Sequence, residues 1–291
     1  MAHALKLAAL GGRAVAPNPM VGAVIVKNGK IIGKGYHKKF GGPHAEVNAI
    51  NSVKNKKDLV GSTIYVTLEP CRHYGKTPPC LDLIKKVGIA KIVCGSADSF
   101  QKKITNHKSQ ITILFLHGSI AKKCQALNKF YNKWIAKKVP FITVKIAVSA
   151  DGFVAGKNGK HVHITSKKQN IEVHKLRAMH QAIMVGSNTV INDDPQLNVR
   201  LVKGPDPLRI ILDSKKRVPK TAKVFRDKNF MHITKRMSLK KLFSQLAEQR
   251  ISSVLVEPGP TLYKVLKKLK LIDELIVFTG RRKIHEGIKI V

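Results

Sequence analysis

Residues 41–55 read GGPHAEVNAINSVKN, and residues 62–80 read STIYVTLEPCRHYGKTPPC. The first stretch contains a His followed two positions later by a Glu, and the second contains two of the chain's four Cys. These residues are His44, Glu46, Cys71 and Cys80. His nitrogens and Cys sulfurs are preferred zinc ligands, and a catalytic zinc has three protein ligands and one open position. The two stretches therefore predict a zinc site held by His44, Cys71 and Cys80.

Glu46 is predicted to be a catalytic residue rather than a zinc ligand. Zinc lowers the pKa of water in its open position to about 7, and a nearby carboxylate can carry a proton from that water to a leaving amine. A helix that begins after Pro43 would present both His44 and Glu46 from its first turn. His-x-Glu followed by Pro-Cys and a further Cys is the pattern of zinc deaminases, in which the Glu is not a ligand.

The spacing of the two Cys differs from that of most base deaminases. Eight residues, RHYGKTPP, separate Cys71 from Cys80, where the usual number is two. Cys80 follows two Pro and is expected to begin a helix, whose dipole favours a thiolate. In the alternative interpretation, His44 caps a helix and the Cys are small buried apolar residues; the order of all four residue types favours the metal site.

The chain resembles a known enzyme family over nearly its whole length. In the first half the resemblance is carried by PNPMVGAVIV (17–26) and by the two stretches quoted above. In the second half it is carried by KIAVSADG (145–152), LRAMHQAIMVGSNTVINDDPQLNVR (176–200) and VEPGPTL (256–262). These motifs are similar to those of the bifunctional riboflavin-biosynthesis deaminase/reductase family, and the long insert between the Cys is specific to it among zinc deaminases.

The resemblance implies two α/β domains. Residues 1–139 are expected to form a cytidine-deaminase-like α/β/α domain, and residues 140–291 a dihydrofolate-reductase-like α/β domain that uses NADPH. Independently of the resemblance, the alternation of strand and helix patterns after Phe141 predicts α/β with a largely parallel sheet. The chain ends at Val291, earlier than the family pattern, so a closing part of the reductase sheet is expected to be absent.

By resemblance, four residues of the first domain are expected to contact a phosphorylated pyrimidine substrate: Asn18, His37, His73 and Lys76. As alternatives, Asn18 is a turn residue, His37 ends a strand, and the other two belong to a solvated loop. The family pattern fails at residues 98–124, where DSFQKKITNHKSQITILFLHG replaces an Asp-Pro-Asn-Pro loop and a glycine-rich return. That loop helps to hold the ribose phosphate in the family. After it, one helix is expected over 120–138.

In the second domain, glycine-containing turns at 186–189 and 257–261 follow strands and could face a phosphate, although such turns are common. The resemblance assigns the NADPH contacts to Ala147, His163, Thr189, Asp193, Ser214, Gly259, Pro260 and Thr261. It assigns the substrate contacts to His161, Arg177, Leu197, Arg200 and Glu257, and a guanidinium suits a ribose phosphate. The family's Gly-x-Ser-x-Trp-Ile-Thr reads GKHVHIT (159–165) here, so His161 and His163 replace its Ser and Trp.

The composition is strongly basic, with a formal net charge of +37 over 291 residues. Such charge attracts nucleic acid, but the Lys are dispersed and aromatic residues amount to 5%, so no dedicated nucleic-acid partner is expected. Four Cys without a pairing pattern predict a reducing, cytoplasmic location. No apolar run approaches the roughly 18 residues of a membrane span, and by resemblance the chain is expected to form a homo-oligomer.

The sequence therefore predicts a two-step enzyme of riboflavin synthesis with one zinc ion and NADPH. The lost Ser and Trp and the early end leave open a deaminase joined to a decayed reductase. The zinc pattern and the charge also leave open a deaminase acting on a base in RNA, or a nucleic-acid-binding remnant without catalysis.

Overall fold

The computed structural model describes residues 1–74, 78–101, 111–157 and 162–289. The chain divides into two compact units, Met1–Lys138 and Val139–Val291, which are taken separately below. Among the described residues, no helix has both the length and the apolar character required to cross a bilayer.

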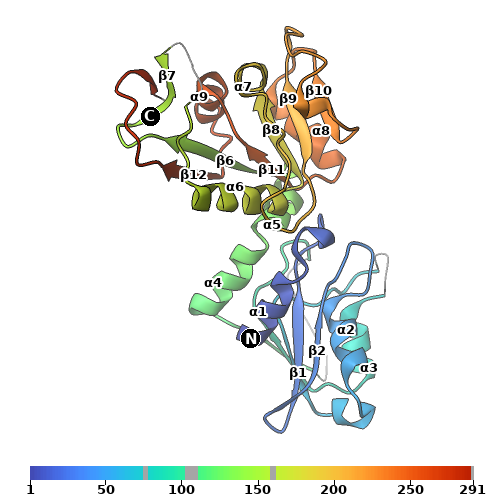
Figure 1. The fold of residues 1–291 in the computed structure, drawn as a ribbon. Helices are drawn as coiled ribbons and strands as arrows, with labels where there is room; N and C mark the ends of the chain where they lie inside the picture. The colour runs from blue at the N-terminus through green and yellow to red at the C-terminus, as the bar shows by residue number, and fades with distance from the viewer. Residues whose placement is uncertain (75–77, 102–110, 158–161, 290–291) are drawn as a thin grey trace. The chain divides into compact units, whose positions relative to one another are not determined.

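The first unit is built around a five-stranded sheet in the order β2-β1-β3-β4-β5 (Figure 1). In chain order its elements are α1 (Ala2–Ala9), β1 (Gly22–Lys27), β2 (Lys30–Tyr36), α2 (Ala45–Ser52), β3 (Thr63–Val66), α3 (Cys80–Lys86), β4 (Lys91–Cys94), β5 (Thr112–Phe115), α4 (Gly118–Leu127) and α5 (Lys129–Lys137). β1 pairs antiparallel with β2 and β3, whereas β3, β4 and β5 run parallel. The β1–β2 turn places Asn28 at φ 50° and Gly29 at φ 73°, as a two-residue Asn-Gly hairpin requires.

Helices cover both faces of this sheet. Gly22 lies against the backbone of Ala4 in α1, whereas Gly35 lies against the backbone of Ala45 and Ala49 in α2. Successive strand residues face opposite sides, and because Ala23 is the partner of Gly35 across the hairpin, α1 and α2 cover opposite faces. Figure 1 shows this arrangement, and apolar side chains of α2, α3 and the sheet pack together in a hydrophobic core. The unit is an α/β/α layer structure.

Gly35 allows α2 to approach β2 closely, which yields a stability prediction. A Cβ at this position would lie 2.3 Å from the Ala49 nitrogen and 2.5 Å from the Ala45 oxygen. Both atoms are backbone, so the helix itself must move. We expect Gly35→Ala to lower the free energy of unfolding by about 1–3 kcal/mol, measured by urea denaturation of the purified protein. An unchanged midpoint would show that α2 does not pack as described.

Two expectations for this unit are corrected. The single helix expected over 120–138 is two helices, α4 and α5, which are separated at Asn128. The buried Asn128 side chain causes the break, because its Oδ1 accepts from the Met20 N–H at 2.8 Å and its Nδ2 donates to the Met20 carbonyl at 3.0 Å. The stretch 98–124 is also not wholly a loop, since it contains the edge strand β5.

The second unit contains a six-stranded parallel sheet in the order β10-β9-β8-β11-β6-β12. Its elements are β6 (Phe141–Val148), β7 (Phe153–Gly156), α6 (Lys167–Met179), β8 (Ala182–Gly186), α7 (Ser187–Asp193), β9 (Leu208–Leu212), β10 (Phe230–Ile233), α8 (Leu239–Glu248), β11 (Ser253–Val256), α9 (Pro260–Lys268), β12 (Glu274–Thr279) and β13 (Gly287–Lys289). The predicted α/β class is confirmed. β7 and β13, which form a separate antiparallel pair, were not predicted.

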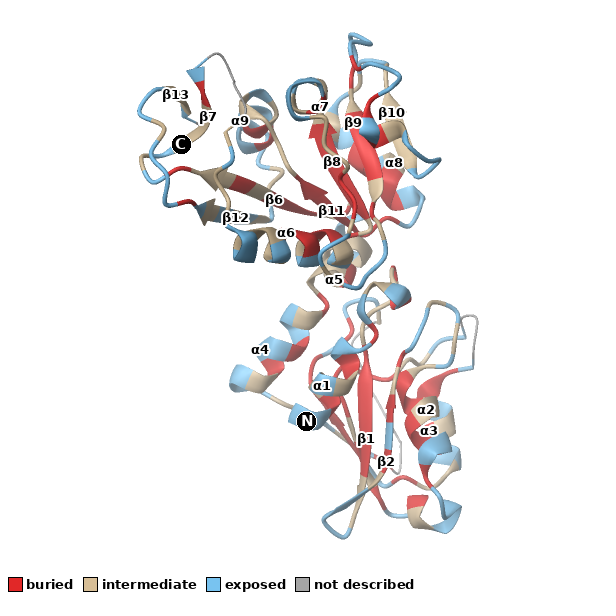
Figure 2. Cartoon of the chain, in the orientation of Figure 1, coloured by how far each residue is buried: buried red, intermediate tan, exposed pale blue. Residues whose placement is uncertain are grey.

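The central strands of the parallel sheet in the second unit are buried on both faces, and Figure 2 shows β8, β9 and β11 as buried. One face packs on α8 and α9. The other packs on α7, on part of α6 and on the segments around Leu197 and Val218. α6 begins at Ser166 with a capping box in which the Ser166 and Gln169 side chains bond each other's backbone N–H. This architecture places the carboxyl ends of β6, β8 and β11 along one edge of the sheet.

Candidate metal centre and cofactor cavity

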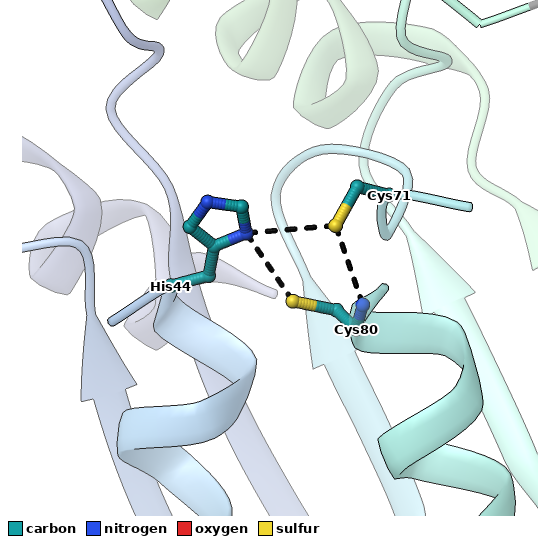
Figure 3. Close-up of side chains that lie close together, drawn as sticks. All are labelled: His44, Cys71 and Cys80. Atoms are coloured by element: carbon teal, nitrogen blue, oxygen red, sulfur yellow. Dashed lines mark hydrogen bonds between the residues drawn. The ribbon is translucent and has the colours of Figure 1, made fainter. Parts of the chain in front are cut away.

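The three predicted zinc ligands come from three different segments of the first unit. His44 is the residue just before α2, with extended backbone at ψ 166°, and is therefore not in the first helical turn as expected. Cys71 lies in the connection after β3, and Cys80 is the first residue of α3, directly after Pro79. Figure 3 shows the three side chains pointing toward one another.

The distances among the ligand atoms fit one tetrahedral zinc ion. His44 Nδ1 lies 3.6 Å from Cys71 Sγ and 3.3 Å from Cys80 Sγ, and all three atoms lie within 4.8 Å of one another. Two donors bound tetrahedrally to zinc at about 2.1 and 2.3 Å stand about 3.6 Å apart. The donor set and its spacing are therefore suited to zinc.

Hydrogen bonds around the sulfurs favour a thiolate at Cys71. The Cys80 backbone N–H at the start of α3 donates to Cys71 Sγ at 3.3 Å. The pKa of Cys71 is lowered to about 4, first by the hydrogen bond from the Cys80 thiol and then by the bond to His44. The same interaction raises the pKa of Cys80, so Cys71 loses its proton first and Cys80 keeps its own. A metal cation in this position would replace that proton.

Glu46 is buried in the first turn of α2, close to the three ligand atoms, and is 3% exposed. Burial raises the pKa of Glu46 to about 7. A carboxyl with that pKa can both accept and release a proton near neutral pH.

Asn18 and His37 form a hydrogen-bonded chain that ends next to His44, one of the three candidate metal ligands. His37 Nδ1 lies 3.0 Å from the Pro43 carbonyl, which can only accept, so Nδ1 carries the proton. His37 Nε2 then accepts from Asn18 Nδ2 at 3.3 Å, which leaves Asn18 Oδ1 as an acceptor for a ligand. Burial lowers the pKa of His37 and favours the neutral ring that this pattern needs.

The other two substrate residues expected in this unit lie in the long insert. His73 is exposed, and its ring makes an edge contact with Phe100 at 4.9 Å between centroids. Lys76 lies outside the described residues.

The second unit contains a cavity of about 550 Å³ at the carboxyl ends of β6, β8 and β11. Most of the residues assigned to NADPH line it: Ala147, His163, Thr189, Asp193, Gly259, Pro260 and Thr261. Ser214 is not among the lining residues and lies exposed after β9. The pair β7–β13 contributes Val154, Ala155 and Ile288. Open α/β sheets bind ligands at this edge, and the cavity is large enough for part of a dinucleotide.

Glu257, directly after β11, lines the cavity and forms a bidentate ion pair with Arg177 of α6. Arg177 Nε and Nη2 donate to the two carboxylate oxygens at 2.9 and 3.1 Å, and Nη1 donates to the Asn198 carbonyl at 3.3 Å. Burial would raise the pKa of Glu257, but the charges of Arg177 and Lys145 outweigh it and lower the pKa to about 2. The carboxylate is therefore ionised.

Leu197 and Arg200, which were also expected to contact the substrate, are not among the residues that line the cavity. Leu197 is 2% exposed and adopts φ 52°. The Arg200 guanidinium donates to Asn198 Oδ1 at 2.8 Å, and its backbone N–H donates to His174 Nδ1 at 3.0 Å. His161 lies outside the described residues. A phosphate contact by Arg177 or Arg200 stays a prediction.

Lys145 on β6 was not singled out from the sequence, yet it lines the cavity with Nζ 3.8 Å from Glu257 Oε2. A signal for it was present, because a Lys stands between the inward-facing Val144 and Ile146 of an otherwise apolar strand. A charged residue buried on such a strand requires a partner. Glu257 is that partner.

The geometry of the metal centre predicts how two Cys variants differ in zinc affinity. We expect Cys80→Ser to weaken zinc binding at least about 10²-fold, because a hydroxyl at this position is a far poorer zinc ligand than a thiolate. Cys94→Ser changes a buried Cys of β4 that is not one of the three candidate zinc ligands. This variant should leave zinc binding unchanged. Competition with a chromophoric chelator measures both. Equal affinity for wild type and Cys80→Ser would exclude Cys80 as a ligand.

Two family matches lie one in each unit of the fold. Residues 1–96 match the cytidine and deoxycytidylate deaminase zinc-binding region, and residues 140–280 match the RibD C-terminal domain. A deaminase domain with a zinc site is thus followed by a reductase domain of the dihydrofolate-reductase type.

Relatives with both domains match nearly the whole chain. The riboflavin biosynthesis protein RibD of Actinobacillus pleuropneumoniae is 38% identical, over 90% of this chain and 77% of that protein. RibD of Escherichia coli (strain K12) is 35% identical, over 96% of this chain and 85% of that protein. The chain belongs to the RibD family of riboflavin biosynthesis proteins, as the sequence motifs predicted.

Solved structures agree with this assignment. A diaminohydroxyphosphoribosylaminopyrimidine deaminase/5-amino-6-(5-phosphoribosylamino)uracil reductase from Thermotoga maritima has a TM-score of 0.90 and 35% identity, covering 100% of this chain and 88% of that one. RibD of Acinetobacter baumannii (form 1) has a TM-score of 0.88 and 32% identity, covering 99% and 88%. The chain is a bifunctional zinc-dependent deaminase and NADPH-dependent reductase.

Proposed function

We propose that this chain catalyses two consecutive steps of riboflavin synthesis on a phosphorylated pyrimidine. The first is hydrolytic deamination of 2,5-diamino-6-ribosylamino-4(3H)-pyrimidinone 5′-phosphate. The second is reduction of the ribosyl group of the product to a ribityl chain. The observation that carries the proposal is the placement of His44 Nδ1, Cys71 Sγ and Cys80 Sγ at zinc spacing beside the buried Glu46.

In the deaminase half, His44, Cys71 and Cys80 hold the zinc ion, which supplies Lewis-acid chemistry when it is bound. Glu46 takes a proton from the attacking water and delivers it to the departing amine. A C–O bond forms at the ring carbon, the C–N bond breaks and ammonia leaves. Asn18 directs its Oδ1 to an N–H donor of the pyrimidine because its Nδ2 is held by His37.

In the reductase half, the cavity at the ends of β6, β8 and β11 holds NADPH, which supplies a hydride for C1′ of the ribose when it is bound. The sugar ring opens as C1′ is reduced, and its ring oxygen gains a proton. Glu257 is kept ionised by Arg177 and Lys145 and is placed to accept a hydrogen bond from a ribose hydroxyl. The size of the cavity and the intact ion pair support an active reductase despite the altered stretch 159–165.

Two further proposals concern the enzyme's surroundings. We expect a homo-oligomer, which is supported by exposed apolar side chains on two edge strands, Leu114 and Phe115 of β5 and Leu275 and Val277 of β12. We place the enzyme in the cytoplasm, because all four Cys are free thiols and thiolate ligands persist in a reducing compartment.

Selective removal of zinc tests the assignment of one activity to each half. Dialysis against a chelator should abolish ammonia release from the diaminopyrimidine phosphate, and added zinc should restore it. NADPH oxidation on the already deaminated ribosylaminouracil phosphate should persist without zinc. Ammonia release that survives complete zinc removal would refute the proposed deaminase mechanism.

A further inference from the structure

Cys71 lies in a connection that has no regular secondary structure of its own. It follows β3, and the next regular element begins at Cys80. On its carboxyl side, the Cys71 carbonyl accepts the Leu81 N–H at 3.2 Å and so ties the ligand to α3. On its amino side, the Glu69 N–H donates to the Ser96 carbonyl beyond β4 at 2.9 Å, and the main-chain groups next to Cys71 have other partners.

One side chain supplies most of these partners. Gln101 Oε1 accepts from the Arg72 backbone N–H at 3.0 Å and from Arg72 Nε at 3.1 Å. Gln101 Nε2 donates to the carbonyls of Pro70 at 3.2 Å and Glu69 at 3.4 Å. The amide therefore binds main-chain groups on both sides of Cys71, and it uses both its acceptor and its donor to do so.

A second layer of bonds fixes the surroundings of Gln101. Arg72 Nη2 donates to Glu69 Oε1 at 2.8 Å, and Glu69 Oε2 accepts the Asp98 N–H at 3.2 Å. Asp98 Oδ1 in turn accepts from the buried Tyr131 hydroxyl of α5 at 3.1 Å. The Gln101 N–H donates to the Asp98 carbonyl at 3.1 Å. These bonds fix Arg72 to the segment that follows β3, and they fix Gln101 to the segment that follows β4.

We propose that Gln101 is a positioning residue for the zinc ligand Cys71. The proposal rests on the proposed zinc site. The Gln101 side chain binds main-chain groups on both sides of Cys71 and so restrains the backbone that carries this ligand. Phe100 in the same segment contacts the ring of His73, so the segment supports the insert on both sides of Arg72.

The test compares Gln101→Met, which keeps the length of the side chain and removes its hydrogen bonds, with Gln125→Met on the exposed surface of α4. Groups that orient metal ligands typically contribute about 10–100-fold in metal affinity. We expect the zinc dissociation constant of Gln101→Met to rise about 10-fold, with a changed sulfur-to-cobalt charge-transfer band after cobalt substitution. Gln125→Met should match wild type in both measurements. Unfolding of the metal-free proteins reports any loss of stability separately.

Gln101→Glu provides a second variant if Gln101→Met does not fold. It keeps the shape and the acceptor for Arg72 but loses donation to the two carbonyls and places a carboxylate oxygen against them, so weaker zinc binding is expected for this variant too. Zinc affinity and a cobalt spectrum equal to wild type in a folded Gln101 variant would overturn the proposal. Failure of the wild-type protein to bind zinc would instead refute the proposed deaminase site.

Discussion

Glu46→Gln is expected to lower the turnover number for deamination by about 10³-fold, within the 10²–10⁴-fold range for a positioned general acid–base group. The amide has the same shape but cannot carry a proton from water to the departing amine. Because Glu46 is not one of the three clustered ligand residues, zinc should still bind at one ion per chain. Ammonia release under saturating substrate measures the loss.

Two comparisons make this prediction specific. Glu172→Gln removes a carboxylate that is exposed on α6, where it pairs with Lys175, and should leave deamination unchanged. NADPH oxidation by Glu46→Gln on the deaminated substrate should equal that of wild type, because Glu46 lies in the first unit and the cavity in the second. Deamination by Glu46→Gln at more than about a tenth of the wild-type rate would exclude the proton-transfer role.

Glu257→Gln is expected to destabilise the second unit by about 3 kcal/mol at neutral pH. The pKa of Glu257 falls from an ordinary 4.5 to about 2 in the folded protein, and each pH unit of difference corresponds to about 1.4 kcal/mol. The variant also leaves the Arg177 guanidinium, 10% exposed, without its anionic partner. Breaking a buried pair in this way costs about 3–5 kcal/mol.

The same shift predicts a pH dependence with a definite sign. Because the folded-state pKa is the lower one, the carboxylate binds fewer protons in the folded protein than in the unfolded chain. Its stabilising contribution is complete above about pH 4.5 and is lost as the pH falls toward 2. Urea unfolding of the second unit at several pH values should show this loss in wild type and not in Glu257→Gln.

The exposed pair between Lys157 and Glu286 provides the control for this prediction. Both side chains are 70% exposed, and exposed pairs contribute about 0–1 kcal/mol, so Glu286→Gln should unfold as wild type does. Glu257→Gln should also lose NADPH oxidation, whereas Glu286→Gln should keep it. Equal stability of wild type and Glu257→Gln from pH 7 down to pH 3 would show that the Arg177 pair does not form as described.

Local chemistry was sufficient to predict much of the fold. Asn28-Gly29 predicted a hairpin because both residues tolerate positive φ. The hydroxyls of Thr165 and Ser166 both suit the cap of a helix that begins after them, and the structure uses Ser166. The order and the chemical type of His44, Cys71 and Cys80 were sufficient to single them out as candidate zinc ligands, and the structure places their ligand atoms within 4.8 Å of one another. For the hairpin and for the start of α6, the signal lies within a few residues of the element it specifies.

Features that depend on distant partners were missed. The break at Asn128 depends on Met20, which lies 108 positions earlier, and the short pair β7–β13 joins segments about 130 residues apart. Gln101 stands in a stretch that departs from the family pattern, so no motif marked it. Lys145 could be interpreted only once Glu257 was placed beside it. The roles of the individual site residues stay predictions.

The central claim is that one chain carries out both reactions in a fixed order, and a single assay tests it. Zinc-loaded wild-type protein receives the diaminopyrimidine phosphate and NADPH, and ammonia release and NADPH oxidation are followed separately in the same sample. The account predicts that ammonia appears first and that NADPH oxidation follows after a lag and reaches the same amount. NADPH oxidation without ammonia release, or the absence of both, would contradict it.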